Sequence, residues 1–440
     1  MRIRIIALIS ILFILLIDNH LSIGSDRIIV GVNTHYAQKK HDDTVLNKLR
    51  TIKIMSIRDE AYWDSIEKVK GVFKIPDHID RYINNAITHG IDPLLGLTYG
   101  NRLYNNEDLP ISEESQNAFL RYAEFMVRRY KSKVVLYQVW NEWNTGFGIK
   151  NRTPTSKGSA KDYIRLLKKV YPAIKKIDPN AIILASSVAR WDVNWIKAIL
   201  DADALHYMDG ISLNPYNYYE AGERRTPESL VQRVADMQKE LAWYNGNKAI
   251  PLYITEVGWP SHSGHGGISA LKSAAYLARF YLMAPTIPAI KGIWWYDLQD
   301  DGTDPKEKEH NFGLLRHDLT LKESFIAFQD IIHLFRFSDF VERIETVSSV
   351  YAVKFKNHDG PTILAVWTDK ESKNVKVTLH YDGMSEERIA TQKVGQGPEW
   401  AEKNLDKATR VVDLLVDEMP LLVKTSHGNV RIVKSSIDVP

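Results

Sequence analysis

Short apolar runs rich in β-branched residues alternate with helical patterns over most of this chain. In segments such as 114–130 and 162–177, apolar residues recur with the period of a helix that buries one face. A repeated strand-helix unit is typical of a parallel sheet, and eight such units predict a closed (β/α)8 TIM barrel, an α/β fold. The predicted strands are residues 28–32, 52–57, 93–97, 134–140, 182–186, 210–213, 251–255 and 292–296.

The pattern changes beyond residue 340. A last barrel helix is predicted over 322–335, and the segments after it are short, strand-like and separated by turn residues. We therefore predict a barrel domain over 25–340 and a small β-sandwich domain over 341–440. Its expected role is structural, packing against the barrel, with direct glycan binding as the alternative. The predicted sandwich strands are residues 350–355, 362–367, 375–380, 409–415, 421–425 and 430–433.

The charge balance excludes some classes of partner. The 440 residues include 57 lysines and arginines and 54 aspartates and glutamates, a formal net charge of +3. So small a surplus does not attract nucleic acid, and the sequence contains no long basic run. The absence of cysteine fits an exported protein without fixing its compartment. We expect a monomer with no nucleic-acid partner.

Residues 1–24 have the pattern of an export signal. Residues 1–4 are basic, residues 5–17 form an apolar stretch, and Ser22-Ile23-Gly24 offers small residues where a signal peptidase cuts. A bilayer span needs about 20 apolar residues, so this stretch is short for a permanent anchor. The sequence predicts a mature protein that begins near Ser25 and is periplasmic or secreted. A retained N-terminal membrane anchor is the alternative.

Two glutamates, Glu142 and Glu256, each close a β-prone run and open into a tryptophan-containing segment, VWNEWN and ITEVGWP. Hydrolysis of a glycosidic bond uses one carboxylic acid to protonate the leaving oxygen and a second carboxylate across the anomeric carbon. Tryptophan provides a flat apolar face on which a sugar ring can stack, and Trp143 is a candidate. A single such glutamate would more often be a solvated loop residue or a helix cap. Two of them after buried-type strands favour a catalytic pair.

With the last strand, IWWYD, these segments resemble clan A of the glycoside hydrolases. Within that clan the chain is most similar to family 39, especially to endoglycosidases of bacterial exopolysaccharide (biofilm) gene clusters. The resemblance implies a retaining mechanism with Glu256 as nucleophile and Glu142 as acid/base. It also implies that Asn141 holds the sugar 2-hydroxyl and that Arg58 lies beneath the nucleophile. The alternative for Arg58 is a surface salt bridge with Asp59 or Glu60.

Further substrate contacts are predicted at the strand ends. Tyr216 is placed to donate a hydrogen bond to Glu256, and Asn214 stands where the family often has histidine. Trp295 is the predicted floor of the sugar subsite, with Trp294 as the alternative because adjacent strand residues face opposite sides. Weaker candidates follow two other strands: His35, Tyr99 and Asn101. The chemistry needs no metal or cofactor.

The resulting hypothesis is a retaining glycoside hydrolase that cuts within an extracellular or periplasmic polysaccharide. Its endo action is implied by the resemblance alone. One rival is a catalytically silent glycan-binding or polysaccharide-assembly protein, although binding alone does not require an acid pair. The other rival is a transglycosylase, in which a sugar replaces water as the acceptor.

Overall fold

The computed structural model describes residues 27–149, 157–185, 187–346, 349–371, 374–382, 388–397, 399–406, 408–425 and 429–437. The predicted export signal, residues 1–24, lies outside these ranges. Among the residues that are described, no helix is both long and apolar enough to cross a membrane.

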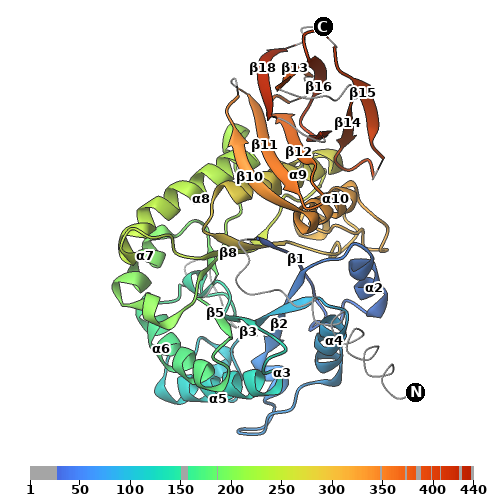
Figure 1. Ribbon diagram of the computed structural model, residues 1–440. Helices are drawn as coiled ribbons and strands as arrows, with labels where there is room; N and C mark the ends of the chain where they lie inside the picture. Colours follow the sequence, from blue (N-terminus) through green and yellow to red (C-terminus); the bar gives the residue numbers. More distant parts are fainter. Residues whose placement is uncertain are drawn as a thin grey trace, which may run out of the picture.

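Parallel strands form a closed barrel in the first part of the molecule (Figure 1). They pair in the order β5-β4-β3-β2-β1-β9-β8-β7-β6. A bridge from Leu184 to Gly210 joins β5 to the segment before β7. The short strands β5 and β6 therefore occupy one strand position between β4 and β7, and the closed barrel has eight strand positions. All eight predicted strands are present. Their bounds are β1 Ile29–Asn33, β2 Ser56–Tyr62, β3 Asp92–Thr98, β4 Leu136–Val139, β5 Ile182–Leu184, β6 Val188–Ala189, β7 Ile211–Asn214, β8 Leu252–Val257 and β9 Ile290–Trp295.

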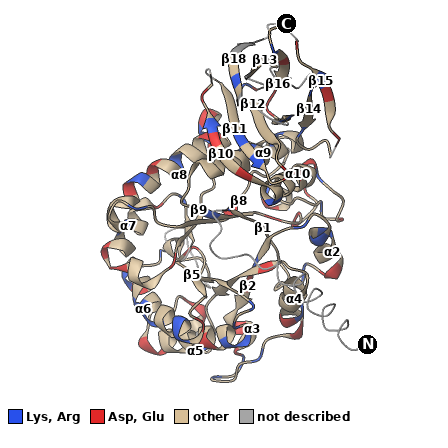
Figure 2. Cartoon of the chain, in the orientation of Figure 1, with Lys and Arg blue, Asp and Glu red and all other residues tan. Residues whose placement is uncertain are grey.

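Amphipathic helices cover the outside of the barrel. Several begin where a hydroxyl side chain accepts a hydrogen bond from a backbone N–H of the first turn, as Ser112, Ser159 and Ser269 do. Charged residues lie mainly on these outer helices and on the sandwich (Figure 2). The helices are α2 Asp43–Thr51, α3 Trp63–Ile66, α4 Asp77–Thr88, α5 Glu113–Arg129, α6 Ala160–Ile177, α7 Val193–Asp201, α8 Pro227–Ala242, α9 Ala270–Met283 and α10 Glu323–Phe337.

Two apolar layers hold the barrel together. A small cluster includes Leu94, Leu136, Leu184, Tyr253 and Trp294, which are contributed by five different strands. These residues fill the inside of the barrel, and the much larger cluster packs the outer strand faces against the helices. Both faces of each barrel strand are therefore buried.

A second domain follows α10 as two antiparallel sheets, and the predicted sandwich strands are all present. The sequence prediction missed β10, β14 and β15. The β10 segment is an edge strand whose charged residues face solvent, so it lacks the apolar alternation of a half-buried strand. The strands are β10 Ser338–Ile344, β11 Val350–Asn357, β12 Thr362–Thr368, β13 Val375–Asp382, β14 Arg388–Lys393, β15 Ala401–Asn404, β16 Val411–Val416, β17 Leu421–Thr425 and β18 Asn429–Ile437.

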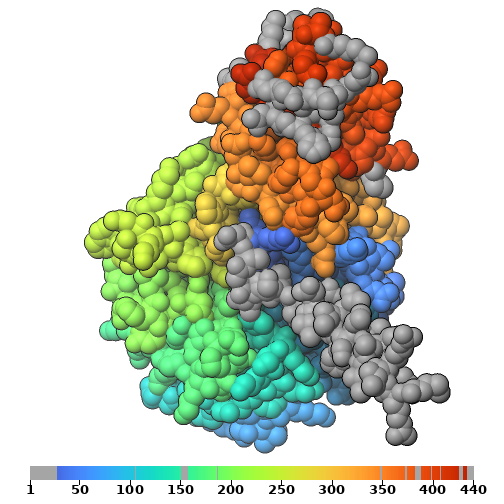
Figure 3. All heavy atoms as spheres, viewed as in Figure 1, coloured from blue at the N-terminus to red at the C-terminus, as the bar shows by residue number. Residues whose placement is uncertain are grey.

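A buried polar contact ties the sandwich to the barrel, on which it is seated in Figure 3. Arg279 of α9 donates two hydrogen bonds to the carboxylate of Glu228 of α8, at 2.8 and 2.5 Å. Trp367 of β12 donates its indole N–H to the same carboxylate at 2.8 Å. The Arg279 and Trp367 residues are fully buried. This Glu228-Arg279-Trp367 contact makes the two domains one packed body.

Candidate active site

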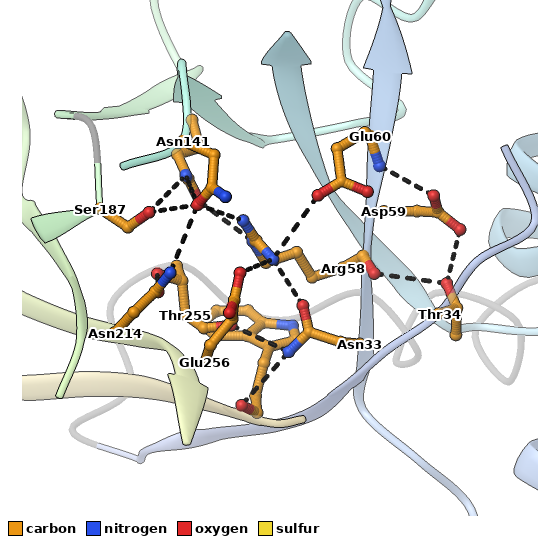
Figure 4. A network of polar contacts seen from close by, with 12 residues as sticks. Asn33, Thr34, Arg58, Asp59, Glu60, Asn141, Ser187, Asn214, Thr255 and Glu256 are labelled. Carbon is orange, nitrogen blue, oxygen red and sulfur yellow. Dashed lines mark hydrogen bonds and ion pairs between the residues drawn. The ribbon is translucent and has the colours of Figure 1, made fainter. Parts of the chain in front are cut away.

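Glu142 and Glu256 lie at the same end of the barrel, where the carboxyl ends of the parallel strands meet (Figure 4 labels Glu256 and Arg58). Glu256 is part of β8, whereas Glu142 follows β4 at a sharp turn. Trp140 and Glu142 have backbone φ angles of 69° and 50°, in the left-handed region that side-chain-bearing residues rarely adopt. The turn carries Glu142 out of the strand and into the short helix η3, Trp143–Thr145.

Arg58 of β2 is the centre of the polar network. Its Nη1 donates to Glu256 Oε1 at 3.0 Å and to Asn33 Oδ1 at 2.6 Å. Its Nε donates to Gln138 Oε1 at 3.0 Å, and its Nη2 donates to Asn141 Oδ1 at 3.1 Å. The Arg58 side chain is 2% exposed, so this is a buried cation beside a carboxylate. The surface salt bridge that was the alternative role for Arg58 is therefore excluded.

Tyr216 holds the second oxygen of Glu256. Its hydroxyl donates to Glu256 Oε2 at 2.9 Å, which is the contact that the sequence predicted. Burial, then the negative charge of Glu256, with a smaller contribution from Glu142, raise the pKa of Tyr216 well above its usual value. The phenol therefore stays protonated and remains a hydrogen-bond donor at neutral pH.

Glu142 accepts a hydrogen bond from a neutral donor. Asn214 Nδ2 donates to Glu142 Oε1 at 3.0 Å. Thr255 Oγ1 donates to Asn214 Oδ1 at 2.9 Å, and this bond fixes which end of the Asn214 amide faces Glu142. The asparagine that stands where the family often has histidine thus contacts the other glutamate, not Glu256.

Asn141 is tightly held next to this pair. Its Nδ2 donates to the Tyr99 hydroxyl at 3.0 Å, and its Oδ1 accepts from Ser187 Oγ as well as from Arg58. Gln138, Ser187 and Asn33 were not predicted as site residues, yet all three are buried parts of the network. Gln138 had a visible signal, because it is a polar residue in the middle of an apolar strand.

The tryptophan predictions were wrong. Trp143, Trp294 and Trp295 are all fully buried. Trp294 fills the inside of the barrel and donates its indole N–H to Ser56 Oγ at 3.0 Å. Trp295 packs beside Trp259 in the layer under the helices, with ring centroids 6.0 Å apart. None of the three presents a face to a sugar.

The weaker candidates divide into two groups. Asn101 was a wrong prediction as a sugar contact, because its buried side chain bonds to the backbone at Trp63, Glu67 and Leu103. Tyr99 is partly exposed and contacts Asn141. His35 follows β1 and packs edge-on to Tyr296, with ring centroids 6.0 Å apart.

An acidic pair surrounds His35. Its Nδ1 lies 3.5 Å from Asp297 Oδ2 and 3.8 Å from Asp301 Oδ1. Burial lowers the pKa of His35 to about 4, so the imidazole is neutral at neutral pH. These three residues have the spacing of metal ligands. The Lys40 ammonium, 2.7 Å from Asp301 Oδ1, already provides a cation there.

Tyr296 is the aromatic residue that the sequence reasoning missed. It directly follows β9 and is only partly buried, and its ring centroid lies 6.2 Å from that of Tyr216. Burial and the charges of Asp297 and Glu256 raise the pKa of Tyr296 well above its usual value. Tyr296, and not Trp294 or Trp295, therefore provides an aromatic face beside Glu256.

We expect Tyr296→Ala to lower kcat/KM about tenfold or more while the protein melts normally, because it removes an aromatic contact to substrate and little core packing. Trp295→Phe provides the control. It is expected to lower the free energy of unfolding by about 1–3 kcal/mol and to leave kcat/KM nearly unchanged. Steady-state kinetics and thermal melting measure both. If Trp295→Phe lowered kcat/KM and Tyr296→Ala did not, Trp295 would be the substrate contact.

A parallel barrel with paired glutamates at its strand ends defines a glycoside hydrolase of clan A, as the sequence predicted. The chain belongs to the cellulase family (glycosyl hydrolase family 5), whose model matches residues 23–295. The protein is thus a glycosidase.

Solved structures share the fold. A family 39 glycoside hydrolase from Bacteroides cellulosilyticus WH2 has a TM-score of 0.71 at 24% identity, over 90% of this chain and 81% of that one. A GH51 alpha-L-arabinofuranosidase from Thermotoga petrophila RKU-1 has a TM-score of 0.61 at 13% identity, over 91% and 96%. Xylanase 10B from Thermotoga maritima has a TM-score of 0.53 at 15% identity, over 70% and 95%. No curated protein sequence matches the chain significantly.

Proposed function

We propose that this protein is a retaining endo-glycosidase, with Glu256 as nucleophile and Glu142 as acid/base. The observation that carries the assignment is the way Glu256 is held. A buried arginine and a tyrosine donate hydrogen bonds to its two carboxylate oxygens and fix the direction in which the carboxylate points. Glu142 lies at the same end of the barrel and accepts a hydrogen bond from the Asn214 amide. A retaining hydrolase needs one carboxylate that stays charged and one that carries a proton.

In the first step, Glu142 gives its proton to the glycosidic oxygen as the bond from that oxygen to the anomeric carbon breaks. Glu256 attacks the same carbon and forms a glycosyl ester, so its negative charge is consumed. Arg58 and Tyr216 hold the two Glu256 oxygens in place before the attack. This positioning removes the need to reorganise solvent around the nucleophile.

In the second step, the now ionised Glu142 takes a proton from water. The water oxygen attacks the anomeric carbon, the bond to Glu256 breaks, and both glutamates return to their starting states. Each displacement inverts the anomeric carbon, so two displacements retain its configuration. A sugar hydroxyl in place of water would make the same step a transglycosylation.

The proposal predicts that the first product formed has the same anomeric configuration as the substrate. Proton NMR of the anomeric region during the first minutes of hydrolysis measures this, before mutarotation mixes the anomers. Sizing the products from a polysaccharide panel over the same period tests endo action, for which medium-length fragments are expected. An inverted first product rules out the double displacement, and longer products than substrates indicate transglycosylation.

Three further parts of the proposal rest on the sequence. Endo action and an exopolysaccharide substrate come from the resemblance to biofilm-associated endoglycosidases. Export comes from residues 1–24, with cleavage near Ser25 and a retained anchor as the alternative. A silent glycan-binding role is disfavoured, because binding alone would not need hydrogen-bonding partners for two separate carboxylates.

A further inference from the structure

A third carboxylate, Glu60, lies beside the proposed nucleophile and is not used by the double displacement. It shares β2 with Arg58 two residues away, so both side chains point to the same face of the strand. Figure 4 shows the two side chains facing one another. The Glu60 side chain is 12% exposed, comparable to the 10% of Glu256.

Glu60 has a charge contact but lacks a hydrogen-bonded partner. Its Oε1 lies 3.9 Å from Arg58 Nη1. Both hydrogens of that nitrogen are already donated, to Asn33 Oδ1 and Glu256 Oε1. Within the described ranges, no other residue donates a hydrogen bond to the Glu60 carboxylate.

The neighbouring Asp59 shows what a satisfied carboxylate looks like in the same strand. It accepts hydrogen bonds from Thr34 Oγ1 at 2.8 Å, from the Tyr36 backbone N–H at 2.7 Å and from the Glu60 backbone N–H at 2.8 Å. The Asp59 carboxylate is therefore hydrogen-bonded within the chain. The carboxylate of Glu60 is left available to something that the chain itself does not provide.

Among the described residues, acidic groups outnumber cations around Glu60. Arg58 is a single cation that faces two carboxylates, Glu256 at 3.0 Å and Glu60 at 3.9 Å. Burial raises the pKa of Glu60, an effect that Arg58 opposes and the charge of Glu256 increases. Lys40 is paired with Asp301. Burial keeps His35 neutral, with a pKa of about 4. Like charges in a partly desolvated site repel strongly, and a ligand with a positive group would remove the imbalance.

The position of Glu60 relates it to the sugar ring. Glu60 Oε1 lies 3.9 Å from Arg58 Nη1, and Arg58 Nη2 donates a hydrogen bond to Asn141 Oδ1 at 3.1 Å, so one guanidinium contacts both side chains. Asn141 is the residue that the resemblance to clan A assigns to the sugar 2-hydroxyl. Glu60 is thus on the side of the site that faces carbon 2 of the sugar.

We propose that Glu60 sets the charge of the sugar that the site accepts: it favours a hexosamine unit with a free amino group and excludes uronic acid units. This inference rests on the proposed hydrolase function and narrows its substrate class. A protonated amine on carbon 2 provides both the positive charge and the N–H donors that the Glu60 carboxylate lacks. A uronate brings a third negative charge next to Glu60 and Glu256.

The test uses aryl glycosides that share one leaving group and differ only in sugar charge. Each sugar, in the gluco, galacto and manno configurations and as both anomers, is supplied as the 2-amino sugar, the neutral parent and the uronate. For the best configuration, we expect kcat/KM of the amino sugar to exceed that of its neutral parent by about tenfold, and that of the uronate by about 100-fold or more. Measurement at pH 6 keeps the amine protonated.

Substitution then assigns the effect to Glu60. We expect Glu60→Gln to lower the ratio of amino-sugar to uronate turnover at least tenfold, and Glu60→Asp, which keeps the charge, to preserve most of it. Glu114→Gln is a matched control, because Glu114 is an exposed glutamate on α5 whose side chain is 70% accessible and pairs with Lys70. Thermal melting of each variant confirms folding, and the wild-type ratios stand even if a variant unfolds.

The outcomes separate the two proposals. A neutral or uronate sugar as the best substrate, or an unchanged ratio in Glu60→Gln, overturns the charge preference while leaving the hydrolase proposal intact. If no glycoside of any charge is hydrolysed, the proposed function fails, and the charge preference fails with it.

Discussion

Glu256→Gln is expected to reduce turnover by at least about 10⁴-fold on every substrate, because it removes the atom that forms the covalent bond to the sugar. The amide nearly matches the carboxylate in size, so Arg58 and Tyr216 keep their places and the fold is maintained. Glu142→Gln is expected to behave differently. It should cost about 10²–10⁴-fold on natural glycans, whose leaving oxygen needs a proton, and far less on aryl glycosides with acidic leaving groups.

Initial rates on one poor and one good leaving group measure this difference. Glu114→Gln, on the exposed face of α5, is the matched control and should behave as wild type. Near wild-type hydrolysis of a natural glycan by either active-site variant would contradict the role given to that glutamate. Reversed leaving-group dependence would mean that the two roles are exchanged.

Arg279→Met is expected to destabilise the whole molecule by about 3–5 kcal/mol, because it leaves Glu228 as a buried carboxylate without its cation. Glu228 would retain the indole N–H of Trp367 as a donor, but none of the described residues would place a positive charge at hydrogen-bonding distance. Denaturant unfolding measures the loss. A single transition is expected, since the contact joins both domains.

A double-mutant comparison isolates the charge effect. Glu228→Gln combined with Arg279→Met should recover much of the lost stability, because a neutral amide costs less to bury than a carboxylate. Arg129→Met removes an exposed partner of Asp80 and should cost at most about 1 kcal/mol. Two separate unfolding transitions, with only the sandwich affected by Arg279→Met, would show that the domains are independent.

The barrel could be predicted from sequence because each strand and helix has its own hydrophobic period, which is a local property. The resemblance and the predicted strand ends placed Arg58, Tyr216 and Asn214 beside the two glutamates, and all three contact one of them. Arg58 lies within β2, however, because that strand is longer than predicted. Their specific partners could not be predicted. Whether Asn214 bonds to Glu142 or Glu256 depends on side-chain rotation, which neighbouring residues such as Thr255 decide.

The tryptophan predictions failed for a physical reason. Alternation shows that Trp294 and Trp295 face opposite sides of β9, but in a barrel both sides are buried, one by the interior and one by the helices. The aromatic ring near Glu256 belongs to Tyr296, just past the strand end. Glu60 was missed as a site residue because β2 was predicted to stop at residue 57, whereas it continues to Tyr62.

At the left-handed turn of Trp140 and Glu142, selection for stability and selection for activity favour different residues. A side chain held at positive φ costs about 1–3 kcal/mol relative to a relaxed backbone. Glycine or asparagine relieves this strain, so a screen for heat-resistant variants would be drawn to residues 140 and 142. The most robust survivors would then include proteins that lack the proton donor. A thermostabilisation campaign is therefore best run with residues 140–142 held fixed.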